Sequence, residues 1–142
     1  MQEVRQERTF WRDEGLSQLH RTLGMNCPMT DIDFLALEFD RCKASLLVEY
    51  KNEHAKIVDP NKNASYKALI DLGDRAGLPV IECRYSDNYS AWCPKPLNIN
   101  AFNFIHNNET MTLYEWTRLL YKIRGRELTP EEFRRFRSNS HV

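Results

Sequence analysis

The stretch ASLLVEYK, residues 44 to 51, constrains the fold more than any other part of the sequence. Its apolar run predicts a buried β-strand, yet Glu49 and Lys51 place two opposite charges at the end of that strand. Because side chains of a strand alternate between faces, Glu49 and Lys51 share one face and Val48 and Tyr50 the other. Two structures explain such a pair: the solvated end of an ordinary strand, or a metal site that handles phosphate.

A second strand is predicted just before it, over residues 31 to 39, DIDFLALEF. Only residues 40 to 43 separate the two strands, a length typical of a β-hairpin, so antiparallel pairing is expected. The start of the first strand then lies beside the end of the second. Asp31 and Asp33 are therefore expected close to the charged pair, which would gather three carboxylates and one lysine.

The other segments add helices and two more strands. Apolar spacing and turn residues predict helices over 10 to 23 and 64 to 76, strands over 79 to 85 and 89 to 96, and two C-terminal helices. Pro94 and Pro96 suggest that the last strand lies at an edge. This order predicts an α/β or α+β fold with a central mixed sheet of about four strands flanked by helices.

Local signals mark the helix ends. TLYE at 112 to 115 and TPEE at 129 to 132 have the pattern of capping boxes, in which the first residue and the fourth satisfy each other's backbone N–H groups. Within the helix at 64 to 76, four apolar residues fall on one side: Ala68, Leu69, Leu72 and Ala76.

Length and charge narrow the class of protein. A chain of 142 residues is expected to form one domain. Lys and Arg number 20, as do Asp and Glu, which excludes a strongly cationic nucleic-acid coat protein but allows a local basic patch. No apolar run approaches the roughly 18 residues of a membrane span. The charged N-terminus lacks the apolar core of a signal peptide, so a cytoplasmic protein is expected.

The cysteines, tryptophans and C-terminal arginines could each serve structure or function. The cysteines lack the paired spacing of a zinc site and are expected to be free, mostly buried thiols: Cys27, Cys42, Cys83 and Cys93. The tryptophans are expected in the core or at an interface: Trp11, Trp92 and Trp116. The arginines of the C-terminal tail could grip a nucleic-acid backbone or form the solvated face of a helix: Arg124, Arg126, Arg134, Arg135 and Arg137.

The chemistry of the charged strand ends favours a metal. Carboxylates at a half-buried sheet end are costly unless they are paired or bind a cation. Mg²⁺ prefers carboxylates together with water and phosphate oxygens. A lysine on the same face can stabilise charge that develops on a reacting phosphate.

At this point the chain resembles the PD-(D/E)xK nuclease superfamily, the restriction-endonuclease-like fold. The resemblance rests on DID followed by apolar residues, a hairpin into V-E-x-K, and the helix and strand that follow. It covers about residues 10 to 97 and leaves 98 to 142 as a C-terminal helical extension. No proline precedes Asp33, so the PD half of the motif is absent.

The resemblance implies a metal-dependent nuclease, most simply one that acts on DNA. Asp33, Glu49 and Lys51 then match the catalytic residues, with Mg²⁺ or Mn²⁺ held by Asp33, Glu49, the carbonyl of Tyr50 and Glu14, for which Asp13 competes. Residues expected near the substrate are Lys67, Lys62, His54 and Asp31. Cutting both strands of a duplex would require a homodimer. The small size suits a phage or mobile-element nuclease.

Two other interpretations remain open. The fold could serve as a binding module for protein or nucleic acid without turnover, in which case the three catalytic candidates are structural. Alternatively, the chain could be a scaffold protein whose C-terminal helices mediate assembly through apolar surface near Trp116 and Tyr121.

Overall fold

A computed structural model describes residues 14–106 and 109–139. The chain divides into two units, Met1–Asp31 and Ile32–Val142, each described here by itself. The described part of the first unit holds helix α1 (Glu14–Leu23) and a 3₁₀ turn, η1 (Gly24–Asn26). The predicted helix is thus confirmed from residue 14 onward, and residues 10 to 13, with Trp11 and Asp13, lie outside the described residues.

The second unit is built on a mixed sheet of four strands, as predicted. The strands are β1 (Phe34–Glu38), β2 (Lys43–Asn52), β3 (Val80–Tyr85) and β4 (Trp92–Pro96), in that spatial order. β2 pairs antiparallel with β1 and parallel with β3, and β3 pairs antiparallel with β4. The two central strands therefore run in the same direction, joined through a helix, and the proline-containing β4 is an edge strand, as expected.

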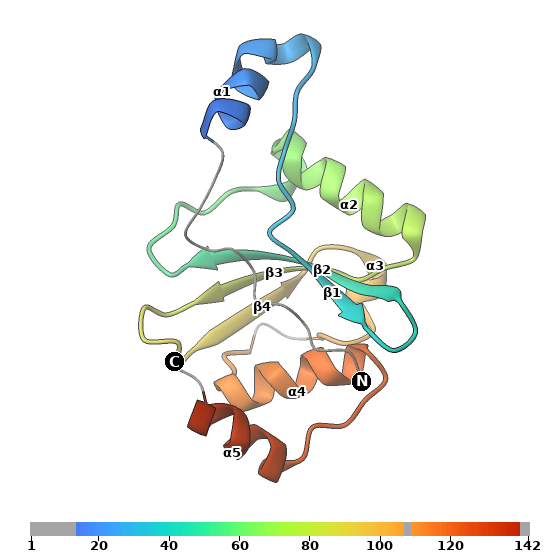
Figure 1. The fold of residues 1–142 in the computed structure, drawn as a ribbon, viewed down its shortest axis with the longest axis vertical. Coiled ribbons are helices and arrows are strands. Elements are labelled where there is room, and N and C mark those ends of the chain that lie inside the picture. The colour runs from blue at the N-terminus through green and yellow to red at the C-terminus, as the bar shows by residue number, and fades with distance from the viewer. Residues whose placement is uncertain (1–13, 107–108, 140–142) are drawn as a thin grey trace. The chain divides into compact units, whose positions relative to one another are not determined.

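Helices cover both faces of this sheet. The helices of the unit are η2 (Pro60–Lys62), α2 (Ala64–Ala76), α3 (Ile99–Phe102), α4 (Leu113–Ile123) and α5 (Pro130–Asn139). Figure 1 shows α2 on one side of the sheet and α4 with α5 on the other. Among the described residues, none of the helices combines the length and the apolar character needed to cross a membrane.

The main core lies between the sheet and α4. Leu46 and Val48 of β2 and Ile81 of β3 are at most 2% exposed and pack with Trp116 and Leu119 of α4. Burying each of these side chains stabilises the fold by about 1.5–3 kcal/mol relative to exposure. The C-terminal helical extension therefore completes the core, and the prediction that Trp116 is a core residue is confirmed, as it is for Trp92.

Helix α2 approaches the opposite face through a glycine. A Cβ added at Gly73 would meet Cγ2 of Val80 at 2.2 Å, so only glycine fits at this crossing. The inner face of α2 contains Tyr66 and Gly73, which are buried. The apolar side expected from the sequence is wrong in part, because Leu72 is 44% exposed and Ala68 and Ala76 are also exposed.

A buried asparagine joins three elements at the start of β3. Oδ1 of Asn98 accepts hydrogen bonds from the backbone N–H groups of Val80 and Ala101, each at 3.0 Å. Its Nδ2 donates to the carbonyl of Leu78 at 2.8 Å and to Oδ1 of Asp74 at 3.0 Å. The side chain of Asn98 thus uses its full hydrogen-bonding capacity, and it also caps the short helix α3, which the sequence did not predict.

The capping box predicted at α4 is confirmed, and at α5 one of its two hydrogen bonds is present. At α4 the Thr112 hydroxyl accepts from the Glu115 N–H, and the Glu115 carboxylate accepts from the Thr112 N–H, each at 3.2 Å. At α5 the Thr129 hydroxyl accepts from the Glu132 N–H at 3.2 Å. These bonds satisfy N–H groups that have no partner within the helix.

Two sequence predictions are corrected by the structure. Strand β1 begins at Phe34 and not at residue 31, so Asp31 and Asp33 precede the strand. The cysteines are free as predicted, but they are not mostly buried, because Cys27, Cys42 and Cys93 are exposed and only Cys83 is buried.

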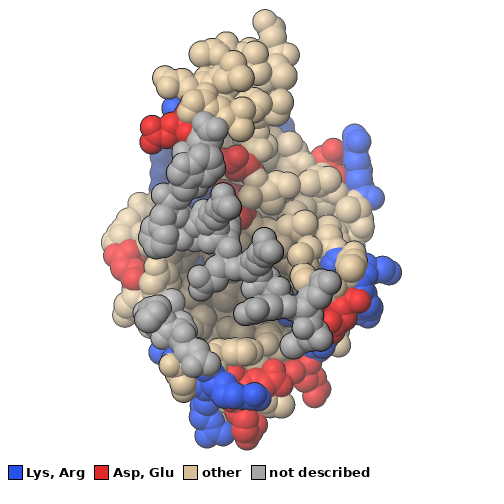
Figure 2. Space-filling model, viewed as in Figure 1, with Lys and Arg blue, Asp and Glu red and all other residues tan. Residues whose placement is uncertain are grey.

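The arginine-rich tail has two different environments. Arg126 donates from Nε and Nη2 to the buried carboxylate of Glu38 at 2.8 and 2.6 Å, and from Nη2 to Asp40 at 2.6 Å. This contact joins the segment after α4 to the end of β1. On α5, Arg134 pairs with Glu131, and charges of both signs lie side by side on this surface (Figure 2).

Candidate functional site

The candidate site lies on the α2 face of the sheet, toward the end of β2. Strand alternation separates Val48 and Tyr50, which contribute to the core under α4, from Glu49 and Lys51. Nζ of Lys51 lies 6.0 Å from the ring centroid of Tyr66 on α2. The two charged residues therefore share a face, as predicted from the sequence.

Asp33 belongs to the same site. Its Oδ2 accepts a hydrogen bond from the backbone N–H of Tyr50 at 3.1 Å, across the β1–β2 pair. The register Phe34↔Val48 explains this contact, since it brings the residue just before β1 alongside the end of β2. The predicted approach of Asp33 to Glu49 is confirmed even though β1 is shorter than expected.

The carboxyl group of Glu49 is in an unfavourable position for a charge. Its pKa is raised, first because the group is largely buried and second because the Asp33 carboxylate lies beside it. Lys51 acts in the opposite direction, with its Nζ 3.2 Å from Oε1 of Glu49. The Glu49 and Lys51 side chains are 17% and 31% exposed, so solvent reaches the site from one side.

Three further residues extend the site, and the sequence reasoning missed all of them in this role. Glu82 of β3 pairs in register with Glu49, and Arg84 pairs with Lys51. The Tyr66 hydroxyl donates to Oε2 of Glu82 at 2.5 Å. The signal was present in the sequence, because E-C-R at residues 82 to 84 repeats the acid–x–base spacing of E-Y-K on the neighbouring strand.

Tyr66 and Arg84 make hydrogen bonds that fix the surroundings of the site. Burial, and then the Glu82 carboxylate, raise the pKa of Tyr66, so its phenol stays protonated and remains a donor. The Arg84 guanidinium donates to the carbonyls of Asn52, Ala55 and Lys56 at 2.9 to 3.2 Å, which fixes the loop after β2. The site is thus supported by α2, by β3 and by the loop that follows β2.

Other predicted site residues lie elsewhere or belong to the other unit. Lys62 is in η2 and Lys67 is on α2, both exposed, and Tyr66 rather than Lys67 is the α2 residue that faces the sheet. Glu14 begins α1 and Asp31 ends the first unit, so their roles at the site stay predictions. The same holds for the Tyr50 carbonyl as a metal ligand.

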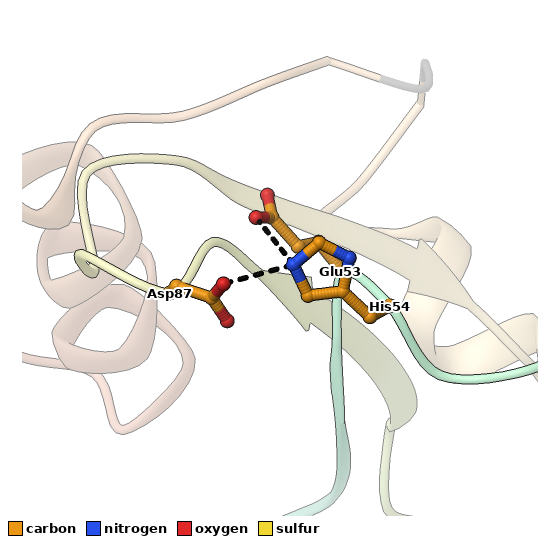
Figure 3. Close-up of side chains that lie close together, drawn as sticks. All are labelled: Glu53, His54 and Asp87. Carbon is orange, nitrogen blue, oxygen red and sulfur yellow. Dashed lines mark hydrogen bonds and ion pairs between the residues drawn. The ribbon is translucent and has the colours of Figure 1, made fainter.

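His54 forms a second, more exposed group of ligand-type side chains (Figure 3). Its Nε2 lies 2.8 Å from Oδ2 of Asp87 and 3.3 Å from Oε1 of Glu53. Asp87 raises the pKa of His54, mainly through this hydrogen bond, which favours the protonated imidazolium. Asp87 also accepts from Nδ2 of Asn52 at 2.7 Å. All three ligand-type residues are exposed, and their mutual pairing explains the group without a cation.

Comparison with protein-family models, with curated proteins and with solved structures finds no match for this chain.

Proposed function

We propose that this chain is a metal-dependent nuclease that hydrolyses phosphodiester bonds, with DNA as the expected substrate. One observation carries the proposal: two carboxylates, Asp33 and Glu49, lie side by side with the lysine of the same strand. Neighbouring carboxylates destabilise one another when both are ionised, and a divalent cation would reduce that cost.

The donor set fits Mg²⁺ or Mn²⁺. Asp33 and Glu49 supply hard oxygen ligands, which Mg²⁺ and Mn²⁺ prefer. Burial and then the neighbouring Asp33 carboxylate raise the pKa of Glu49, so a divalent cation would be favoured beside this pair. A bound Mg²⁺ or Mn²⁺ would polarise the phosphate and lower the pKa of a coordinated water.

The chain's own residues have distinct roles in this proposal. Asp33 and Glu49 would hold the cation, and the bond from the Tyr50 N–H orients the Asp33 carboxylate. The Lys51 ammonium would stabilise the negative charge on the reacting phosphate. Tyr66, Glu82 and Arg84 act as positioning residues behind this group.

The alternative function is a binding module without turnover. The ion pair between Lys51 and Glu49, at 3.2 Å, favours it, because this pair partly neutralises the site without any metal. In that case substitution of the three candidates would leave nucleic-acid or protein binding unchanged.

The deciding experiment is cleavage of labelled single-stranded, duplex and branched DNA and RNA with Mg²⁺, with Mn²⁺ and with chelator. Lys51→Met should lower the cleavage rate about 10²–10³-fold, the size expected for loss of one group that stabilises transition-state charge. Lys56→Met is the matched control, since Lys56 is an exposed lysine in the loop after β2. Absence of cutting on every substrate, with no metal binding by calorimetry, would leave the binding module as the better account.

A further inference from the structure

A cavity of about 410 Å³ lies at the other end of β2. It is formed where the β1–β2 turn, the α2–β3 link, α3 and the C-terminal end of α4 meet, and Figure 1 shows these segments gathered at one end of the sheet. A volume of this size falls within the range of small-molecule sites. Glu49 lies six positions after Lys43 along β2, which corresponds to roughly 20 Å along the strand.

The wall of this cavity is cationic. Arg41, Lys43 and Arg124 line it, against one carboxylate, Glu38. That carboxylate is already bound by Arg126, which in turn binds Asp40. The Arg126 contact, above all, holds the pKa of Glu38 down at about 2, so Glu38 is ionised at neutral pH. Arg41 and Arg124 also lie 3.8 and 3.7 Å from the Glu38 carboxylate, so one acid is shared by three guanidinium groups. The four cations and two carboxylates of this group carry a net charge of two positive units.

Hydrogen-bond donors at the cavity are also incompletely used. Among the described residues, Nε of Arg124 is buried and has no hydrogen-bond acceptor, its nearest carboxylate oxygen being Oε2 of Glu38 at 3.7 Å. Arg41 is held at the rim because its Nη2 donates to the Arg124 carbonyl at 3.0 Å. The side-chain amides of Asn100 and Asn103 belong to the same wall.

We infer that this cavity binds a phosphate monoester. The net charge of two positive units matches a phosphate dianion. Guanidinium groups bind phosphate through pairs of N–H donors, and a smaller anion with a single charge would accept fewer of these hydrogen bonds. The amides of Asn100 and Asn103 add neutral donors for the remaining oxygens. Two sources carry this group: a small phosphorylated metabolite such as a mononucleotide, or the phosphorylated end of a nucleic-acid strand.

The first test is a titration of the full chain with inorganic phosphate, followed by amide NMR. The amide signals of Gly77, Leu78, Asn100 and Asn103 should shift, and the binding should weaken as salt is added. Signals of Tyr50 and Lys51 should stay in place, since they belong to the opposite end of β2. No shift at the cavity with millimolar phosphate, or shifts spread evenly over exposed lysines, would overturn the inference.

Two variants test the residues themselves. Arg41→Gln and Lys43→Gln should each weaken phosphate binding about tenfold, as expected for loss of one charged hydrogen-bond partner. Lys122→Gln, at an exposed lysine of α4 outside the cavity wall, should leave the affinity unchanged. Arg41 is an exposed side chain, so its variant is expected to fold, which thermal unfolding would verify. Unchanged affinity in both folded cavity variants would contradict the assignment.

A comparison of ligands identifies the source of the phosphate. A mononucleotide that binds more tightly than inorganic phosphate, with no gain from a longer strand, indicates a small metabolite. A 5′-phosphorylated oligonucleotide that binds at least tenfold more tightly than its unphosphorylated form indicates a strand end. Both results support the site, whereas equal binding of phosphorylated and unphosphorylated ligands would exclude it. Because this test needs no cleavage, it is independent of the proposed nuclease activity.

Discussion

The backbone N–H of Tyr50 donates to the Asp33 carboxylate at 3.1 Å, and this single bond ties the segment before β1 to the strand that carries Glu49 and Lys51. The bond leaves the rest of the Asp33 carboxylate free to face Glu49. Its consequence is that two acids are held together in the folded protein, at a cost that only a proton, a lysine or a cation can reduce.

Asp33→Asn should separate metal binding from folding. The asparagine keeps a carbonyl oxygen for the Tyr50 N–H, but it removes one negative charge from beside Glu49. In chelator the melting temperature should stay equal or rise. Mn²⁺ should raise the melting temperature of the wild type but not that of the variant, because the variant has lost a metal ligand. Residues that only support a ligand typically contribute 10–100-fold to metal affinity, so loss of a ligand itself is expected to cost about 100-fold or more.

Thermal unfolding with and without Mn²⁺ measures both effects. Asp71→Asn is the control, since Asp71 is an exposed acid on α2 that pairs with Arg75 one turn along the same helix. A strong fall in the melting temperature of Asp33→Asn in chelator would show that the carboxylate stabilises the fold and is not held there against repulsion.

The raised pKa of Glu49 predicts a specific dependence of stability on pH. In the folded protein Glu49 holds its proton to a higher pH than in the unfolded chain, whose pKa is near 4.5. As pH rises from that value through the folded pKa, this residue therefore lowers the free energy of unfolding. Glu38, whose pKa is lowered to about 2, acts in a different range: its contribution to stability is complete above pH 4.5 and is lost as the pH falls below that value.

The contribution of Glu49 is isolated by the difference between the wild type and Glu49→Gln. Urea unfolding at several pH values, in chelator, should show that the variant gains stability relative to the wild type as pH rises. Glu127→Gln, at an exposed position, should show no such gain. Curves for wild type and Glu49→Gln that stay parallel across this range would mean that Asp33 and Glu49 do not repel each other in solution.

Tyr66→Phe should destabilise the protein by about 1–3 kcal/mol, the cost of leaving a buried polar group without its donor. The group left behind is the Glu82 carboxylate, whose Oε1 lies 4.0 Å from Nε of Arg84. Urea unfolding measures the change. Tyr89→Phe should change stability far less, because the Tyr89 side chain is 42% exposed. Equal effects of both substitutions would rule out the Tyr66–Glu82 bond as a supporting contact.

Gly73→Ala should cost about 1–3 kcal/mol or more, as overpacking does in a filled interior. The new Cβ would meet Cγ2 of Val80, so Val80→Ala in the same chain should recover part of the loss. A double-mutant cycle of unfolding free energies measures the coupling between Gly73→Ala and Val80→Ala. Additive effects of the two substitutions would show that α2 shifts away from β3 instead of pressing on it.

Much of the fold was predictable because strong local signals agree with the tertiary structure. The limits of α2 match because Asn63 and Gly77 are good caps, with Gly77 in the left-handed conformation at φ 70°. The hairpin and β2 match because burial on both faces keeps that strand apolar. The sequence predicted that β1 begins at residue 31 and not at Phe34, because Asp31 and Asp33 alternate with apolar residues as side chains of a strand do. In the structure both residues precede the strand, and the Asp33 carboxylate accepts from the Tyr50 N–H.

The candidate site was only half predictable, for a related reason. Spacing along one strand reveals Glu49 and Lys51, but register between strands is needed to see that Glu82 lies beside Glu49. The side of α2 that faces the sheet depended on Gly73, whose missing side chain lets the helix approach and so turns Tyr66 inward. A periodicity of apolar side chains cannot report a contact made by a glycine.

The packing of Trp116 and Leu119 on the sheet also sets the smallest piece of the chain that can fold alone. A fragment ending near residue 97 keeps every strand, yet it would leave Leu46, Val48 and Ile81 facing water, and the carboxylate of Glu38 without Arg126. A protein that ends where the resemblance to the nuclease superfamily ends, near residue 97, should therefore be insoluble or unfolded. The C-terminal third has to be present in any expressed version of this protein before its chemistry can be assayed.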